Sequence, residues 1–426
     1  MTAADPPPPA SHLAGRRVVL GVTGGIAAYK AVEVCRRLVD AGAHVAPVLT
    51  EGATRFVGAA TFSALASEPT QTTLFDEPHP IPHTRLGQGA DVVVVAPATA
   101  RLLADYATGR SDDLLTATLL ATRAPVVVAP AMHTEMWEHP AVQDNVATLA
   151  RRGVVVVPPE EGRLAGGDVG AGRLADPAAI VAAVEAAVGP RDLAGTTVLV
   201  TAGGTREPID PVRFVGNRSS GKQGHAVAAE AAARGAAVTL VTTSGLALPA
   251  GVEVVRVETA AEMHDAVMAR AATAEVVVMA AAVADFRPRS PSHHKIKKGE
   301  GVPEVALEPT VDILATLGAR RRPGQTLVGF AAETRDVEAA AADKLRRKGV
   351  DLIVANDVGA PGAGFEHDTN RVMVLSASGI DQDVPLSDKR LVARAVIDAV
   401  VGHRRGPAGG PTAPPSSPSP PRSPEP

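Results

Sequence analysis

The sequence is poor in cysteine and in aromatic residues. Cys35 is the single cysteine in 426 residues, which excludes an intrachain disulfide and a CxxC metal site. Its surroundings, VEVCRRL, are typical of a helix, so we interpret Cys35 as a small buried hydrophobic residue. Aromatic residues make up only 2% of the chain, whereas hydrophobic residues make up 45%. The cores must therefore consist of alanine, valine and leucine.

Long apolar runs and a strong excess of one charge are also missing. No apolar run approaches the roughly 18 residues of a membrane span. The N-terminal segment, MTAADPPPPA, lacks the basic and apolar regions of a signal peptide. The net charge of −4 gives no electrostatic reason to expect nucleic acid as a partner. We therefore expect a cytoplasmic protein with no membrane and no nucleic-acid partner.

Short valine-rich runs recur along the chain with helical stretches between them. These runs are continuous rather than alternating, which is typical of parallel strands covered on both faces of the sheet. In the first half we expect strands at 18–22, 45–50, 92–96, 126–129 and 154–157, and helices at 26–41 and 178–188. In the second half we expect strands at 198–201, 238–242, 276–279, 327–330 and 352–355.

Both halves open with a strand, a pair of glycines and a helix, at Gly24-Gly25 and at Gly203-Gly204. This recurrence predicts an α/β chain of two doubly wound, Rossmann-like domains with mainly parallel sheets. Gly189-Pro190-Arg191 is the best boundary between them. We expect a disordered segment at 1–15, domains at 16–190 and 191–403, and a disordered Pro/Ser-rich tail at 404–426.

The stretch VLVTAGGTREPIDPVRFVGNRSSGKQG, from residue 198, predicts a site for a phosphorylated ligand. A strand, a glycine turn and a helix N-terminus bring unpaired N–H groups together, and Arg206, Arg213, Arg218 and Lys222 add positive charge. A rival interpretation is the phosphate loop of nucleotide hydrolases, because the segment ending at Lys222 fits G-x-x-x-x-G-K. That motif requires Ser or Thr at the next position, where this chain has Gln223.

The glycine turn of the first half favours a mononucleotide over NAD. The acidic residue that a dinucleotide ribose requires is not clear, since Glu51 lies beyond the second strand. The segments TEGATRFVGAATF, APATA and PAM each follow a strand, where such folds bind ligands. This set resembles the FMN-dependent cysteine decarboxylase family over residues 16–188. The resemblance implies that FMN is bound by Gly24, Gly25, Ile26, Thr50, Pro97, Ala98, Thr99 and Met132.

The second half carries TAGGTREPIDPVRFVGNRSSGKQG, AAAVADF, KIKK, GFAAET and DLIVAND. In this order the motifs resemble phosphopantothenate–cysteine ligases. Residues 16–403 thus resemble the bacterial bifunctional phosphopantothenoylcysteine decarboxylase/phosphopantothenate–cysteine ligase family of coenzyme A biosynthesis. The resemblance implies that CTP activates 4′-phosphopantothenate as an acyl-cytidylate, that cysteine displaces CMP, and that the adduct is then decarboxylated to 4′-phosphopantetheine.

In the decarboxylase half, the resemblance assigns a catalytic role to His83, in HPIPHTRLG. Two departures from the family pattern concern the same half. His133 stands where the PAMN motif has the asparagine that holds the substrate carboxylate. Gly166 stands where the flap motif CGDxGxGR has the cysteine that donates a proton. A histidine can still donate a hydrogen bond, but the proton donor that replaces the cysteine is unidentified.

In the ligase half, the resemblance assigns catalysis to Asn217 and to the triphosphate-site residue Lys295. It places Asp285 at the Mg²⁺ ion and at CTP. Lys344 and Lys348 are separated by one helical turn and so lie on one helix face. The substrate-binding set implied by the resemblance is His133, Arg213, Met279, Asp285, Lys295, Val311, Asp312, Ile313, Leu314, Phe330, Lys344 and Lys348.

Two other interpretations stay open. One is an FMN-binding redox or regulatory protein that has lost decarboxylase activity, because the flap cysteine and the asparagine are both replaced. The other is an NAD-dependent reductase built from two Rossmann halves. The resemblance also implies a homo-oligomer, with trimeric decarboxylase contacts and dimeric ligase contacts.

Overall fold

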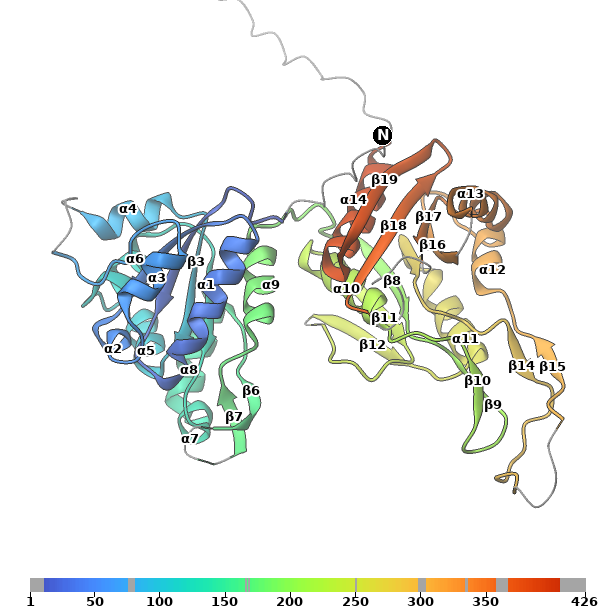
Figure 1. Cartoon of the computed structure of the whole chain (residues 1–426), viewed down its shortest axis with the longest axis horizontal. Helices are drawn as coiled ribbons and strands as arrows, with labels where there is room; N and C mark the ends of the chain where they lie inside the picture. The colour runs from blue at the N-terminus through green and yellow to red at the C-terminus, as the bar shows by residue number, and fades with distance from the viewer. Residues whose placement is uncertain are drawn as a thin grey trace, which may run out of the picture. The chain divides into compact units, whose positions relative to one another are not determined.

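The computed structural model describes residues 11–75, 81–164, 167, 169–249, 251–297, 304–333, 336–357 and 367–406. The chain packs as two compact units (Figure 1). The first unit extends from Pro9 to Arg191, and the second begins at Asp192. Each unit has its own sheet and its own hydrophobic clusters.

The first unit is built on a five-stranded parallel sheet of order β2-β1-β3-β4-β5. Its strands are β1 (Arg17–Val22), β2 (His44–Leu49), β3 (Val92–Ala98), β4 (Val126–Pro130) and β5 (Val155–Val156). The predicted parallel α/β class is confirmed for this unit. The last strand is shorter than expected because only two of its residues pair with β4.

Helices cover both faces of this sheet, as continuous apolar strands require. One face packs against η1 (Ile26–Tyr29), α1 (Lys30–Asp40), α3 (Ala59–Leu65) and α9 (Pro177–Val188). The other face packs against α4 (Pro82–Gly89), α5 (Ala100–Thr108), α6 (Leu114–Ala121) and α8 (Pro140–Arg151). Short helices α2 (Glu51–Thr54) and α7 (Thr134–Glu138) and the hairpin β6 (Glu160–Arg163) and β7 (Val169–Arg173) complete the unit.

Part of the N-terminal segment that the sequence predicts to be disordered is ordered. Residues 11–15 form a turn in which Leu13 is fully buried. Leu13 belongs to the cluster that includes Leu38 and Val184, from α1 and α9. The proline-rich composition hides this single anchoring leucine, which is why composition alone misplaces the start of the folded unit. The Pro-rich remainder, residues 1–10, and the tail from residue 407 lie outside the described residues.

The second unit is built on an eight-stranded sheet of order β12-β11-β8-β13-β16-β17-β18-β19. Six strands are parallel: β8 (Thr197–Ala202), β11 (Ala237–Thr242), β12 (Val252–Arg256), β13 (Val276–Met279), β16 (Thr326–Glu333) and β17 (Leu352–Asp357). The last two, β18 (Thr369–Ser376) and β19 (Gly379–Asp388), are antiparallel. These two and β12 are not among the expected strands. β12 has no fully buried position, β18 mixes buried with half-buried positions, and the first half of β19 is mostly exposed, so no continuous apolar run marks them.

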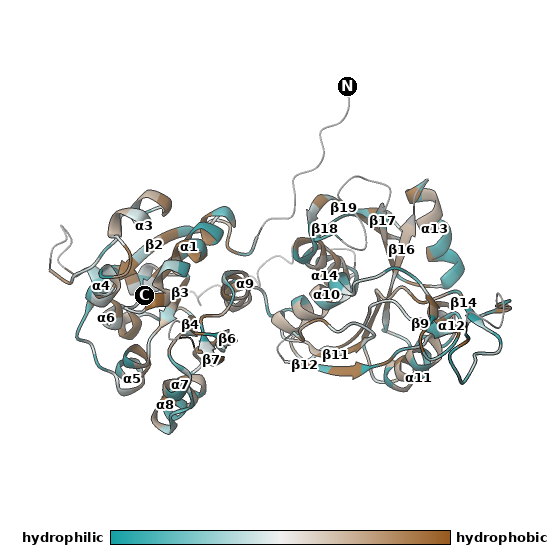
Figure 2. Cartoon of the chain, turned by 60° about the horizontal axis from the view of Figure 1, so that its bottom comes forward, coloured by the Kyte–Doolittle hydropathy of each residue, from teal (hydrophilic) through white to brown (hydrophobic). Residues whose placement is uncertain are grey.

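Two helical layers sandwich this sheet. Helices α10 (Lys222–Ala233) and α14 (Lys389–Arg405) pack on one face, and α11 (Ala260–Ala271), α12 (Ile313–Ala319) and α13 (Val337–Lys348) on the other. Two small hairpins project from it: β9 (Arg206–Pro208) with β10 (Phe214–Gly216), and β14 (Phe286–Pro288) with β15 (Leu307–Pro309). Figure 2 shows hydrophobic colour on the strands and hydrophilic colour on the outer side of α13.

None of the helices within the described residues combines the length and the apolar composition that a bilayer span needs.

Candidate functional site

The strand order of the first unit reverses between β1 and β3. The chain leaves β1 towards β2 on one side and reaches β3 on the other, so the loops after these strands diverge. Ligands of doubly wound sheets bind at such a switch point, outside the carboxyl ends of the strands. The predicted flavin-binding residues all follow or end strands of this sheet, after β1 (Gly24, Gly25, Ile26), after β2 (Thr50), at the end of β3 (Pro97, Ala98, Thr99) and after β4 (Met132).

The glycine turn of the first unit leaves no room for a side chain. A Cβ atom on Gly24 would lie 2.6 Å from the backbone carbon of Gly52. The loop after β1 and the start of α2 are therefore in direct backbone contact. Gly25 next to it faces open space, with Thr99 Cγ2 the nearest atom at 3.8 Å from a Cβ. Such a cradle of bare backbone suits a flat ligand that carries a phosphate.

Threonine side chains hold the segments that follow β1, β2 and β3. Thr23 donates a hydrogen bond to the carbonyl of Pro97 (2.7 Å) and accepts one from the N–H of Thr99 (3.1 Å). Thr50 and Thr99 accept hydrogen bonds from Ala53 and Leu102 and so cap α2 and α5. The ends of β1 and β3 are thereby held at a fixed separation, and the residues present fit a flavin.

The structure places His83 in the first turn of α4, which packs against α6. No hydrogen bond or ion pair within the described part of the chain joins His83 to the flavin-binding residues. The Nδ1 atom of His83 is buried and has no hydrogen-bond partner among the described residues. A buried polar atom without a partner is unusual and points to a group that a ligand completes.

The substituted residue His133 lies where the β6–β7 hairpin docks. His133 is the N-cap of α7, and the N–H of Met132 beside it donates to the carbonyl of Gly172 in β7 (2.9 Å). A Cβ on Gly172 would lie 2.2 Å from the Met132 carbonyl oxygen. The hairpin and the Pro130–His133 segment are therefore in direct backbone contact. Gly166 and Asp168 of the predicted flap lie outside the described residues.

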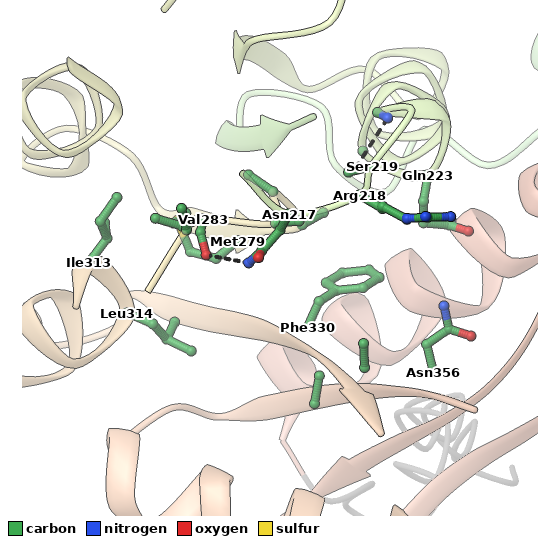
Figure 3. Close-up of a pocket in the computed structure, with 18 of the residues that line it drawn as sticks. Asn217, Arg218, Ser219, Gln223, Met279, Val283, Ile313, Leu314, Phe330 and Asn356 are labelled. Atoms are coloured by element: carbon green, nitrogen blue, oxygen red, sulfur yellow. Dashed lines mark hydrogen bonds between the residues drawn. The ribbon is translucent and has the colours of Figure 1, made fainter. Parts of the chain in front are cut away.

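A cavity of about 730 Å³ lies in the second unit at the carboxyl ends of β13, β16 and β17 (Figure 3). Ten of the residues predicted from the resemblance line it: Asn217, Met279, Asp285, Val311, Asp312, Ile313, Leu314, Phe330, Lys344 and Lys348. The segments 217–224, 279–285 and 310–314, distant in sequence, meet around this space.

The glycine turn of the second unit positions Asn217. A Cβ on Gly204 would lie 2.4 Å from the Asn217 carbonyl oxygen, so only glycine allows this approach. The side-chain amide of Asn217 donates to the carbonyl of Val283 (2.9 Å), as Figure 3 shows. The amide is thus fixed on the cavity wall, and its carbonyl oxygen end stays available to a ligand.

The following loop turns into α10 through a left-handed glycine. Gly221 has φ +81° and stands as N-cap of α10. Its N–H donates to Ser219 Oγ (3.3 Å), and the N–H of Lys222 donates to Ser220 Oγ (3.5 Å). The loop therefore presents serine hydroxyls and the helix N-terminus to the cavity, an arrangement that favours an anion.

The opposite wall comes from α12 and α13. Asp312 caps α12 by accepting from the N–H of Ala315 (2.9 Å), and Lys348 hydrogen-bonds its carboxylate. Partial burial alone would raise the pKa of Asp312, but the hydrogen bond and charge of Lys348 outweigh burial and lower that pKa. Lys344 donates to the carbonyl of Phe330 (3.2 Å). Both lysines of α13 thus face the cavity.

Two of the predicted residues do not line this cavity. The Arg213 guanidinium donates to the carbonyl of Ile296 (2.6 Å), and its Nε atom lies 3.5 Å from Asp210. Lys295 is exposed in the segment beside Ile296. Arg213 and residues 295–297 therefore lie together, next to the β9–β10 hairpin, and the chain by itself does not bring them to Asn217.

Several residues of the cavity wall are not among the predicted site residues, including Gln223, Asn356, Asn370 and Lys389. Asn370 donates to Gln223 Oε1 (3.0 Å), and Gln223 donates to the Lys389 carbonyl (3.1 Å). Of these four, only Asn356 had a signal, since it follows the apolar run of β17 at the edge where ligands bind.

Within the described ranges, no group of three or more His, Cys, Asp or Glu side chains is arranged to hold a metal ion. Asp285 lines the cavity as an exposed carboxylate. Mg²⁺ is commonly held by one or two carboxylates together with substrate phosphates. Asp285 fits that role only when a phosphate ligand supplies the remaining oxygens.

Two family profiles match the chain and together cover its two units. The Flavoprotein profile matches residues 8–189, and the profile of the DNA/pantothenate metabolism flavoprotein C-terminal domain matches residues 193–403. Together with the glycine turn at the switch point of the first unit and the cavity of the second, these matches define a two-domain flavoprotein of pantothenate metabolism. The interpretation as an NAD-dependent reductase receives no support.

Similar proteins narrow this class. The chain is 55% identical to the coenzyme A biosynthesis bifunctional protein CoaBC of Mycobacterium tuberculosis, over 91% of this chain and 96% of that protein. It is 45% identical to the Bacillus subtilis protein of the same name, over 91% and 97%. The chain belongs to the family of coenzyme A biosynthesis bifunctional proteins, which combine a decarboxylase and a ligase.

Solved structures match each unit separately. One is the C-terminal domain of a CoaBC protein, 41% identical, with a TM-score of 0.43, over 50% of this chain and 96% of that one. Another is the FMN-dependent cysteine decarboxylase SpaF, 36% identical, with a TM-score of 0.38, over 41% and 97%.

Proposed function

We propose that the second unit joins cysteine to 4′-phosphopantothenate at the expense of CTP. The observation that carries this proposal is a single cavity that combines an amide (Asn217), a carboxylate (Asp285) and the lysines of α13. An amide synthesis from an unactivated acid requires cations for a triphosphate, a metal-binding carboxylate and a hydrogen-bonding group for the activated acyl intermediate.

In the proposed reaction the phosphopantothenate carboxylate attacks the α-phosphorus of CTP, and pyrophosphate leaves. The amine of cysteine then attacks the acyl carbon and displaces CMP, losing one proton. Asn217, fixed by Val283, hydrogen-bonds the acyl-cytidylate. Lys344 and Lys348 bind anionic groups of CTP, and Asp285 holds Mg²⁺ together with the phosphates. Arg213 and Lys295 act together, because Arg213 is tied to the KIKK segment through Ile296.

The first unit is proposed to bind FMN at the switch point between β1 and β3 and to decarboxylate 4′-phosphopantothenoylcysteine. When bound, the flavin supplies oxidation and reduction of the substrate. The Gly24 turn, Thr50 and Thr99 hold the cofactor, and His133 hydrogen-bonds the substrate carboxylate. His83 is proposed as the acid–base or orienting group. Its buried Nδ1, which has no hydrogen-bond partner among the described residues, supports this role.

A second candidate function for this unit is a flavin-binding redox or regulatory role without decarboxylation. Gly166 in place of the flap cysteine and His133 in place of the asparagine favour it. It predicts a yellow protein that releases no carbon dioxide from phosphopantothenoylcysteine. We also propose that the enzyme is a cytoplasmic homo-oligomer, with trimeric decarboxylase and dimeric ligase contacts.

The test uses the full chain with FMN, phosphopantothenate, cysteine, CTP and Mg²⁺, followed by mass spectrometry. We expect phosphopantetheine, CMP, pyrophosphate and carbon dioxide. Accumulation of the cysteine adduct would favour the second candidate for the first unit while supporting the ligase. No CTP-dependent adduct would reject the ligase proposal. A parallel reaction with ATP in place of CTP measures nucleotide selectivity.

A further inference from the structure

One lysine of the cavity wall in the second unit makes an ion pair that has no place in the proposed chemistry. Lys222, the first residue of α10, donates from Nζ to Asp368 Oδ1 at 2.5 Å. The Asp368 side chain is 80% exposed and that of Lys222 is 37% exposed. Lys222 lines the cavity directly after the loop that presents Ser219 and Ser220. The Asp368 carboxylate therefore pairs with the Lys222 ammonium group at the part of the cavity wall that is most suited to an anion.

Hydrogen bonds from Lys389 to the backbone hold Asp368 in this position. Lys389, which is only 6% exposed, donates from its backbone N–H to the Asp368 carbonyl (3.0 Å) and from Nζ to the His367 carbonyl (2.5 Å). The Lys389 carbonyl in turn accepts from Gln223, the neighbour of Lys222. The starts of α10 and α14 and the segment before β18 are thus tied together, and the ion pair is built into the wall.

Lys222 and Lys389 both line this wall. Burial, and then the charge of Lys222, lower the pKa of Lys389, whereas Asp368 and Asp388 act in the opposite direction. The hydrogen bond and charge of Lys222 hold the pKa of Asp368 below its ordinary value. The carboxylate is therefore ionised, and it partly offsets the repulsion between the two lysines.

An independent feature of the same cavity is a buried polar atom without a hydrogen-bond partner among the described residues. Asn356 is 9% exposed, and its Oδ1 atom is buried with no hydrogen-bond partner within the described residues. Figure 3 shows Asn356 on the side of Phe330 that faces Gln223, among the cavity residues. A buried amide oxygen is costly unless a partner completes it. The region around Lys222 is therefore arranged for an occupant.

We propose that Asp368 is an internal competitor for the polyphosphate of the nucleotide: it pairs with Lys222 and gives up this lysine when a polyphosphate binds. The inference rests on the proposed ligase function. A polyphosphate carries several charges and reaches the helix N-terminus as well, whereas the carboxylate carries one charge, so the exchange favours the ligand. The competition weakens polyphosphate binding and so assists release of pyrophosphate after the acid is activated.

The test is calorimetric titration of the full chain with inorganic pyrophosphate and Mg²⁺. It compares the wild type, Asp368→Asn, Lys222→Met, the double variant and the control Asp265→Asn. Asp265 is a matched control because its side chain is 83% exposed, it contacts a cationic partner type (His264) and it lies on α11. We expect Asp368→Asn to bind pyrophosphate about two- to fivefold more tightly, the range of an exposed ion pair. Asp265→Asn should match the wild type.

The double variant separates exchange from simple charge repulsion. If Asp368 acts through Lys222, Asp368→Asn produces no gain in the Lys222→Met background. An equal gain in that background, or no gain in the single variant, would overturn the inference. Circular dichroism checks that each variant is folded. CTP-dependent adduct formation by the wild type is measured on the same preparation, so a failed ligase proposal and a failed exchange give different results.

Discussion

The two units begin alike and end in different sites. In the first, the turn at Gly24 closes on the backbone of Gly52, and the loops beside it carry glycine, threonine and proline. In the second, the turn at Gly204 closes on the backbone of Asn217, and the cavity beside it carries lysines and carboxylates. In our proposal the same strand–glycine–helix unit serves a flat cofactor in one case and a charged nucleotide in the other. The segments that follow the later strands decide which.

The sharpest way to break this comparison is to disable one unit and measure both activities. Asn217→Asp replaces the amide that Val283 orients with a charged carboxylate. We expect the rate of amide formation to fall by about 10²–10³, as when one stabilising donor is removed, with the acyl-cytidylate accumulating. Product and intermediate are followed by mass spectrometry. Decarboxylation of supplied phosphopantothenoylcysteine is the internal control, and wild-type ligation would remove Asn217 from the mechanism.

The reciprocal change is His83→Asn in the first unit. We expect decarboxylation to fall by about 10²–10⁴ because a general acid–base group is lost, while ligation keeps its wild-type rate. Carbon dioxide release and CMP formation are measured on one preparation. A joint loss of both activities would contradict the independence of the two units.

Matched glycine substitutions sharpen the comparison at the turns themselves. Gly24→Ala places a Cβ 2.6 Å from Gly52, and Gly204→Ala places one 2.4 Å from Asn217. Overpacking of this kind costs about 1–3 kcal/mol. We expect roughly tenfold or greater loss of FMN affinity in the first variant and of CTP affinity in the second. CTP affinity should be unchanged in the first variant and FMN affinity unchanged in the second.

The control for both is Gly58→Ala, whose Cβ would meet nothing nearer than 3.8 Å. Flavin absorbance per chain and nucleotide titration provide the two measurements. Loss of flavin in Gly204→Ala would show that the units are coupled.

The smallest expected effect concerns stability in acid. Arg234 donates to both oxygens of Asp192 (2.8 and 2.7 Å), and this hydrogen bonding is the main reason why the pKa of Asp192 is lowered. A lowered pKa means that the stabilisation is present above the unfolded value of about 3.9 and is lost as the pH falls through the folded value. Asp192→Asn should cost the second unit roughly 1.5 kcal/mol at pH 7.

This difference in unfolding free energy should shrink as the pH falls below about 4. Urea denaturation at several pH values measures it, and Asp265→Asn, an exposed residue on α11, is the control. An equal difference between wild type and Asp192→Asn at pH 7 and pH 3 would show that the ion pair is not the source.

Much of the fold follows from local pattern. The valine-rich runs and glycine turns predict the parallel strands of both sheets, because strands buried on both faces leave a continuous apolar signature. The antiparallel pair β18 and β19 escapes prediction, since half-buried strands with Asp, Gln and Ser leave none. Leu13 escapes for a similar reason: one anchoring leucine in a proline-rich segment has no periodicity.

The sites divide in the same way. Residues at strand ends and glycine turns, such as Thr50, Thr99 and Asn217, are accessible to sequence reasoning because doubly wound sheets bind ligands at that edge. Gln223, Asn370 and Lys389 are not, because only the packing of α10 against α14 brings them together.

The sequence by itself determined two α/β units, their parallel strands and the glycine turn at the start of each, since strand burial and turn geometry depend on neighbours in the chain. Only the tertiary structure decided which charges meet. It brought Lys222 to Asp368, 146 positions later, and left Arg213 beside Ile296 rather than Asn217. Contacts between distant segments depend on how helices pack on a finished sheet, and no local pattern encodes that arrangement.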